Sequence, residues 1–426
     1  MGEVSGGRAH AGAALRPDPR AVPKPAATQI PSLLGSPVQY VIITNDALAA
    51  EFQRLADWKT QTGVPAVVRT LSLHPASSTR RGRTTPSGSA MFIRDAYSRW
   101  GTKWVLLGGD TEIIPDASTP APATTAARTS RADMYFSCLD GNWNADGNRY
   151  YGEAQPADPS TASTCLPEVY VGRAPVATVA DAKQFVDKTL QYTSRRRSAT
   201  TRTRCCSSPR CCSRRTGRPA MPIELDGAML AEERAALDSQ RTRTCATGAS
   251  TRTTRTRRGS PGALPETREA VLDSLNRGYN VAVHIGHGYR NVMSVGDRQS
   301  LTTRDALALT NGNRLTNLYA INCTSNAIDF PCIGEAFLHA QNGGAVTSVG
   351  STRFDFPVRG PVLRAGLLQG HVRRRLHGAW ARRRRGRSCR SSSSPTYDNA
   401  YRWTQFTLLD AGRSRAADLD RQAAAR

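Results

Sequence analysis

One histidine and one cysteine stand where two hydrophobic runs end, an arrangement suited to nucleophilic catalysis. The run from residue 280 ends in His287-Gly288, and the run from residue 315 ends in Cys323. If the two runs are neighbouring parallel strands, their carboxyl ends share one sheet edge and the imidazole comes within reach of the thiol. A thiolate nucleophile needs such a base or cation nearby, and a glycine after the histidine leaves a backbone N–H unobstructed for an oxyanion. On spacing alone, a buried cysteine and a turn histidine remain the simpler explanation.

A zinc site is the alternative within the same region. Its ligands would be His284, His287, Cys323 and Cys332. An odd offset on a strand sends two side chains to opposite faces, so His284 and His287 are poorly placed to share a metal. Cys332, beside Ile333, is typical of a core position, and the spacing therefore disfavours zinc.

A polar loop in the first half of the chain has the spacing of a calcium loop. Oxygen-bearing side chains occupy positions 1, 3, 5, 7 and 12, and Gly147 occupies position 6, where the chain must turn sharply. These candidate ligands are Asn142, Asn144, Asp146, Asn148 and Glu153. Asn stands at position 1 where Asp is usual, and no flanking helices are predicted. The pattern indicates either a calcium site on a loop or a polar turn that contains glycine.

Hydrophobic periodicity predicts the elements that must position these residues. Short β-branched runs predict strands, and apolar residues at spacings of three and four predict helices. Strands that alternate with helices are typical of an α/β fold with a parallel sheet. The predicted strands are 38–44, 64–71, 103–110, 166–173, 280–288, 315–323 and 344–350, and the predicted helices are 48–58, 91–100, 179–192, 269–278 and 333–340.

The charge of the chain is concentrated in three islands. The protein has 426 residues and a formal net charge of +24. Segments 195–218, 239–260 and 369–395 hold nine, six and nine arginines and no acidic residue, which equals the whole surplus. Six of the ten cysteines lie there as well. No uncharged apolar run approaches the roughly 20 residues of a membrane helix, so the sequence predicts no membrane span.

Three interpretations of the islands compete. Nucleic-acid binding would favour lysine and interleaved aromatic residues, but the islands contain no lysine and Trp380 alone is aromatic. A disulfide or zinc framework would require regular cysteine spacing, which adjacent pairs such as Cys205-Cys206 do not supply. We favour a third interpretation, out-of-frame translation of a GC-rich gene. Compensating one- or two-base shifts at the island edges would support it, and an intact reading frame there would reject it.

The blocks between the islands resemble the gingipain-like cysteine peptidases, peptidase family C25 of the caspase-like clan. The resemblance rests on the order and number of blocks over about 38–194 and 264–361, with a remnant at 397–409. The blocks are the strand and helix through Asp57-Trp58-Lys59, the strand 104–110 with Ile114-Pro115, Pro167-Glu168-Val169-Tyr170-Val171-Gly172-Arg173, the His287-Gly288 strand, Asn322-Cys323 through Leu338, and Tyr397-Asp398-Asn399-Ala400-Tyr401-Arg402-Trp403.

The resemblance implies a cysteine endopeptidase that hydrolyses polypeptides. Cys323 would attack the scissile carbonyl, His287 would protonate the leaving amine, and the N–H groups of Gly288 and Cys323 would form the oxyanion hole. Glu168 is the acid expected to orient the histidine, with a surface carboxylate at a strand start as its alternative. Asp110, also at a strand end, could cap a helix or order a loop. The chemistry requires no cofactor, and calcium, which gingipain-like enzymes use, would be structural.

The implied fold is α/β, a three-layer α/β/α caspase-like fold with mostly parallel sheets in two adjacent subdomains. We expect a disordered leader (1–37) and an amino-terminal α/β subdomain (38–194). An aberrant segment (195–263) with a short family-like stretch (223–233) precedes the catalytic subdomain (264–368). A second aberrant segment (369–426) contains the remnant 397–409.

The sequence leaves more than one hypothesis open for the function and the localisation of the protein. A non-catalytic or frame-damaged remnant of a peptidase is the second hypothesis, and an arginine-rich nucleic-acid binder is the third. Secretion is implied by the resemblance, although the leader has no signal-peptide pattern. The sequence leaves the oligomeric state and the substrate preference open.

Overall fold

The computed structural model describes eleven stretches of the chain. They are residues 37–73, 86–120, 129–144, 147, 150–152, 167–198, 204–209, 246–251, 264–296, 299–355 and 407–412. The leader up to residue 36, the stretch 223–233 and the island 369–395 lie outside these residues. None of the helices in the described stretches is long and apolar enough to cross a membrane.

The amino-terminal unit is a parallel sheet with helices on both faces. Its strands follow the order β2-β1-β3-β6, and Tyr40 of β1 pairs with both Ala66 of β2 and Trp104 of β3. The strands are β1 (Tyr40–Thr44), β2 (Ala66–Thr70), β3 (Trp104–Gly108) and β6 (Tyr170–Ala174). The helices are α1 (Ala49–Gln61), α2 (Pro86–Trp100), α3 (Met134–Ser137) and α4 (Val179–Ser198), with a 3-10 turn at Leu71–Leu73.

The side chains of the fully buried strand β1 pack into the hydrophobic clusters on both faces of the sheet. Val41 and Ile43 pack with Phe92 of α2 on one face. Tyr40 and Ile42 pack with α1 and α4 on the other face. Because side chains alternate along a strand, one apolar run of five residues contributes to both layers. This is the three-layer α/β/α arrangement that the family resemblance implies.

The carboxyl-terminal unit repeats this plan around β10 and β14, which end two residues before His287 and Cys323 and are shorter than the predicted strands 280–288 and 315–323. Its strands follow the order β15-β14-β10-β7-β8-β9, all parallel. They are β7 (Arg204–Pro209), β8 (Ala246–Thr251), β9 (Leu264–Pro265), β10 (Val281–Ile285), β14 (Thr316–Ile321) and β15 (Ala345–Ser351). The helices are α6 (Arg268–Asn276), α7 (Thr303–Leu307) and α8 (Ile333–His339). A small antiparallel sheet contains β11 (Gly288–Tyr289), β12 (Val292–Ser294) and β13 (Ser300–Thr302).

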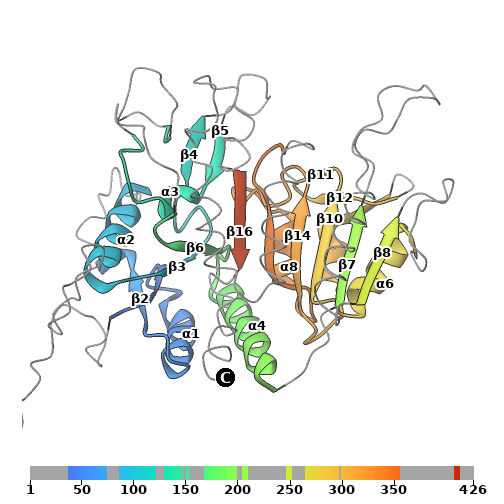
Figure 1. Cartoon of the computed structure of the whole chain (residues 1–426), viewed down its shortest axis with the longest axis horizontal. Coiled ribbons are helices and arrows are strands. Elements are labelled where there is room, and N and C mark those ends of the chain that lie inside the picture. The colour runs from blue at the N-terminus through green and yellow to red at the C-terminus, as the bar shows by residue number, and fades with distance from the viewer. Residues whose placement is uncertain are drawn as a thin grey trace, which may run out of the picture.

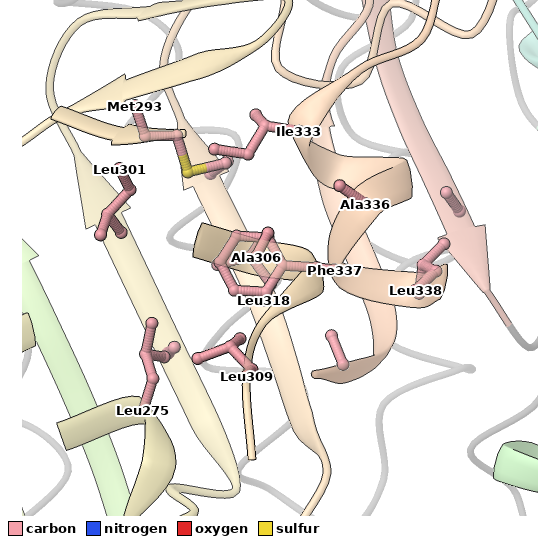
Figure 2. Close-up of a cluster of buried hydrophobic side chains, with 14 of the residues drawn as sticks. Leu275, Met293, Leu301, Ala306, Leu309, Leu318, Ile333, Ala336, Phe337 and Leu338 are labelled. Atoms are coloured by element: carbon pink, nitrogen blue, oxygen red, sulfur yellow. The ribbon is translucent and has the colours of Figure 1, made fainter. Parts of the chain in front are cut away.

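One hydrophobic cluster fastens these helices to the sheet. Figure 2 shows Phe337 of α8 beside Leu318 of β14, with Leu275 of α6 and Met293 of β12 at its margin. Phe337 is 1% exposed, and burial of such a side chain contributes roughly 2–3 kcal/mol. The cluster therefore holds the element that follows the Cys323 loop against the strand that precedes it.

Strand β16 (Leu408–Gly412) joins the two units into one sheet of eleven strands. It pairs antiparallel with β15 and parallel with β6, so the strands of the two units run in opposite directions. In Figure 1, β16 (red) stands between the units and points opposite to β14, β10, β7 and β8. The predicted adjacent subdomains are thus continuous, and the predicted remnant 397–409 ends within this joining strand.

The structure also contains short elements that the pattern-based expectation lacks. Strands β7 and β8 lie in the arginine islands, where hydrophobic periodicity predicts neither helix nor strand. Parallel pairing uses backbone N–H and C=O groups, so a strand can extend a sheet without an apolar pattern. The hairpin of β4 (Ala117–Pro120) and β5 (Thr129–Ala132) and the small sheet β11–β13 are likewise too short to give a periodic signal.

Candidate functional site

The ends of β10 and β14 meet at one edge of the sheet. The two strands are parallel neighbours, with Ile285 opposite Ile321, and the N–H of Gly286 donates to the carbonyl of Ile321 at 3.1 Å. His287 and Cys323 each follow two residues after this last pair. A Cβ placed on Gly288 would lie 2.7 Å from the carbonyl oxygen of Cys323, so only glycine fits there. The structure thus brings His287, Gly288 and Cys323 together.

The backbone of His287 is held in place and its side chain is exposed. Its N–H donates to Ser294 Oγ at 3.1 Å, and its carbonyl accepts from both Ser294 N (3.0 Å) and Ser294 Oγ (3.0 Å). Hydrogen-bonded and non-hydrogen-bonded pairs alternate in an antiparallel ladder. The next pair, Gly288 with Met293, is therefore the non-hydrogen-bonded one, and the N–H of Gly288 points away from β12.

The thiol of Cys323 is half-buried and contacts the backbone of Asp355, four residues after the end of β15. Its Sγ accepts a hydrogen bond from Asp355 N at 3.4 Å and donates one to Asp355 O at 3.7 Å. The following residue, Thr324, has a φ of 49°, which is a strained conformation for a β-branched residue. Its N–H donates to Arg353 O at 2.9 Å, which fixes the turn after the cysteine.

His284 is a buried structural residue. The side-chain amide of Asn322 donates to its Nδ1 (3.0 Å), and its Nε2 donates to Ser294 O (2.8 Å), so both ring nitrogens are engaged. His284 is 4% exposed whereas His287 is exposed, as the odd offset predicts. Burial raises the pKa of Cys332 to about 12, which keeps that thiol protonated. Among the described residues there is no cluster of histidine, cysteine and acidic side chains that could hold a metal, so the zinc alternative gains no support.

Glu168 lies just before β6, in the amino-terminal unit. Its Oε2 accepts a hydrogen bond from Leu139 N at 2.6 Å. Burial raises its pKa, and Asp140 adds to this while Arg94 opposes it. No hydrogen bond or ion pair joins Glu168 to His287 in the described part of the chain. Its orienting role remains a prediction.

Asp110, at the end of β3, orders a loop. Its Oδ1 accepts hydrogen bonds from Glu112 N (3.0 Å) and Ile113 N (3.3 Å). The loop-ordering alternative for Asp110 is therefore confirmed.

The calcium-type loop is described only in part. Asp146, Asn148 and Glu153 lie outside the described residues. Asn142 Oδ1 accepts from Asn144 N at 3.0 Å, and Gly147 has a φ of 68°, which suits the sharp turn at position 6. These two features fit a calcium loop and also fit a polar turn. The calcium site remains a prediction.

Sequence reasoning missed several residues that hold the site together. Ser294 fixes the backbone of His287, Asn322 fixes His284, and Asp355 contacts the thiol. Asn322 immediately precedes the cysteine, so its position was a usable signal. Ser294 and Asp355 reach the site only through tertiary folding, and nothing in their local sequence marks them.

Exposed aromatic side chains surround this edge of the sheet. Tyr289 of β11, Phe330 of the loop after β14 and Phe354 of the segment after β15 are 50%, 38% and 39% exposed. The guanidinium of Arg290 lies 3.3 Å from the centroid of the Phe330 ring. The edge therefore offers apolar surface beside the thiol and the imidazole.

Comparison with known proteins agrees with this arrangement. The structure of the Arg-specific cysteine proteinase gingipain R (RgpB) matches with a TM-score of 0.62 and 19% identity, over 89% of this chain and 77% of that one. The complex of the Porphyromonas gingivalis RgpB pro- and mature domains gives a TM-score of 0.60 and 19% identity, over 88% and 78%. Another protease structure gives a TM-score of 0.61 and 14% identity, over 89% and 78%. These likenesses establish the predicted caspase-like (gingipain-type) fold.

A search among curated proteins finds no match. The family model of peptidase family C25 matches residues 34–409, most of the sequence. The chain belongs to peptidase family C25 and is built as a cysteine peptidase.

Proposed function

We propose that this protein is a cysteine endopeptidase in which Cys323 is the nucleophile and His287 transfers the proton. The observation that carries the proposal is the contact between the Gly288 backbone and Cys323, which places both strand ends on one rim. The exposed side chain of His287 and the half-buried thiol suit a pair that must reach a peptide in solvent. Polypeptides are the substrates, and the exposed Tyr289, Phe330 and Phe354 provide surface for apolar side chains.

The chemistry has two steps. The Cys323 thiolate attacks the scissile carbonyl carbon, and the oxyanion accepts hydrogen bonds from the N–H groups of Gly288 and Cys323. The C–N bond then breaks as protonated His287 gives its proton to the leaving amine, which leaves a thioester on sulfur. Neutral His287 next takes a proton from water, hydroxide displaces the thiolate, and the carboxylic acid product departs. Secretion, which the family resemblance implies, belongs to this proposal.

A thiol-directed peptidyl probe and peptide cleavage test the assignment together. Cys323→Ala should abolish probe labelling and cleavage, and His287→Ala should slow both by about a thousandfold or more. Cys332→Ala is the matched control, because Cys332 is buried and should leave both readouts intact. Labelling that persists in Cys323→Ala would reject the proposal.

A second candidate is a non-catalytic or frame-damaged remnant of such a peptidase. It is favoured by the position of β7 and β8, which fall in the arginine islands and extend the sheet directly beside β10. If the islands do not form these strands, β10 loses a neighbour and the domain loses more than the roughly 5–15 kcal/mol that keeps it folded. Circular dichroism of the expressed chain separates the candidates, because a folded, unlabelled protein indicates a remnant and an unfolded one indicates frame damage.

A further inference from the structure

One carboxylate beside the candidate site is shared by two arginines from different units of the molecule. Arg353 donates to Asp329 through Nη1 to Oδ1 (2.8 Å) and Nη2 to Oδ2 (2.7 Å), which is a bidentate pair. Arg131 of β5 donates through Nε to the same Oδ2 at 3.2 Å. Arg131 also pairs with Asp116 (3.3 Å) and donates to Ser118 Oγ (2.9 Å). Two arginines and two aspartates thus form a continuous network.

The network holds both segments that contact the nucleophile. Asp329 lies in the loop that follows Cys323, and Arg353 lies two residues before Asp355, whose N–H contacts the thiol. Thr324, next to the cysteine, donates to the carbonyl of Arg353. The Arg353–Asp329 pair therefore ties the loop after the cysteine to the segment that contacts its sulfur.

Strand β5 anchors this pair from the amino-terminal unit. Thr352 Oγ1 donates to Arg131 O at 3.0 Å, Arg353 Nε donates to Thr129 O at 3.1 Å, and Ser130 Oγ lies 3.3 Å from Thr352 Oγ1. In Figure 1, β4 and β5 stand at the end toward which β10 and β14 point. The hairpin is therefore in direct contact with the rim that carries the thiol.

The network is largely removed from solvent. The side chains of Asp329, Arg353 and Asp116 are 11%, 13% and 5% exposed, and that of Arg131 is 30% exposed. Burial alone would raise the pKa of Asp329, but the hydrogen bonds and charge of Arg353 and the charge of Arg131 lower it, so the carboxylate stays ionised. Buried ion pairs are seldom better for stability than apolar packing, whereas their directional bonds fix geometry. A role in geometry accounts for the network better than a role in stability.

We propose that Arg131, through Asp329 and Arg353, is a positioning residue that holds the Cys323 thiol in its reactive orientation. The inference rests on the proposed function and extends it, because it makes the amino-terminal hairpin part of the working site. In this view Arg131 does not touch the substrate. It fixes the two segments between which the sulfur lies.

The test uses the full chain and compares three variants. Arg131→Gln and Asp329→Asn should each lower kcat about tenfold to a hundredfold and change KM less than about threefold. Both variants should also slow the alkylation of Cys323 by iodoacetamide, which mass spectrometry measures across a range of pH. Arg131→Lys keeps the charge and should recover part of both rates. Arg54→Gln is the matched control, because Arg54 bridges Glu51 and Asp187 far from the rim and should leave kcat and alkylation unchanged.

A double-mutant cycle completes the test. Arg131→Gln combined with Asp329→Asn should lose little more activity than either alone, because both act through one contact. Additive losses, or losses that follow the melting temperature in every variant, would overturn the proposal. If Cys323→Ala abolishes cleavage but Arg131→Gln keeps the normal kcat and alkylation profile, only the positioning role fails. If Cys323→Ala remains active, the proposed function fails.

Discussion

Polar groups at the strand ends are buried in the amino-terminal unit and accessible to solvent in the carboxyl-terminal unit. At the ends of β3 and β6, the fully buried guanidinium of Arg173 donates to Asp133 (2.7 and 2.8 Å), Gly109 O (3.0 Å) and Ile114 O (2.9 Å). At the ends of β10 and β14, an exposed imidazole and a half-buried thiol remain at the surface. Both are carboxyl ends of parallel strands, where α/β proteins gather polar groups. The comparison indicates that polar groups at strand ends are available to a substrate only where they are not already bound by the protein's own hydrogen bonds.

The largest expected effect comes from breaking the Arg173–Asp133 pair. Asp133→Asn leaves the buried guanidinium without its anionic partner, which should lower the free energy of unfolding by about 3–5 kcal/mol. Chemical denaturation measures this loss, and the kcat of the remaining folded protein should not change. Arg99→Gln breaks an exposed ion pair with Asp95 and should cost about 0–1 kcal/mol. A fall in kcat at constant stability would mean that the amino-terminal strand ends also do chemistry.

The second test uses Glu335, in the first turn of α8. Burial raises its pKa to about 7, and the charges of Asp110 and Asp181 add to this, although the Cys332 N–H opposes it. The ordinary value is 4.5, so between pH 4.5 and 7 the folded state binds a proton that the unfolded state releases. Stability from this group is therefore complete below pH 4.5 and is lost as the pH rises to 7.

Glu335→Gln mimics the protonated form and should remove this loss. The variant should match the unmodified protein near pH 4.5 and exceed it at pH 8 by on the order of 1–3 kcal/mol. Thermal unfolding across this pH range measures the difference. A variant that is less stable at pH 8 would show that the bond from Cys332 N–H to the ionised carboxylate outweighs its burial.

The sequence was sufficient for the parts of the molecule that local pattern controls. Strands β10 and β14, which end two residues before His287 and Cys323, and helices α6 and α8 beside them follow from periodicity. The contact of Asp355 with the thiol and the bonds of Arg131 to Asp329 do not, because they join residues 32 and 198 positions apart. Strand β16 is also hard to predict, because its five residues form a strand by pairing with β15 and β6, which are distant in the sequence. Residues that form long-range polar contacts show no periodic pattern in the sequence, and only the folded chain brings them together.

The smallest expected effect concerns the predicted calcium loop, and it asks whether the amino-terminal unit has a binding site of its own. Asn142, Asn144, Asp146, Asn148 and Glu153 would supply the oxygens. A site filled at about ten times its dissociation constant stabilises the folded state by about 1.4 kcal/mol. EDTA should therefore lower the melting temperature by about one to four degrees, and added calcium should restore it. Glu153→Gln, which removes the position-12 carboxylate, should abolish this response, whereas Glu112→Gln, outside the loop, should retain it. A melting temperature indifferent to both EDTA and calcium would leave a polar turn, and the amino-terminal unit would then be a scaffold whose polar groups serve only the fold.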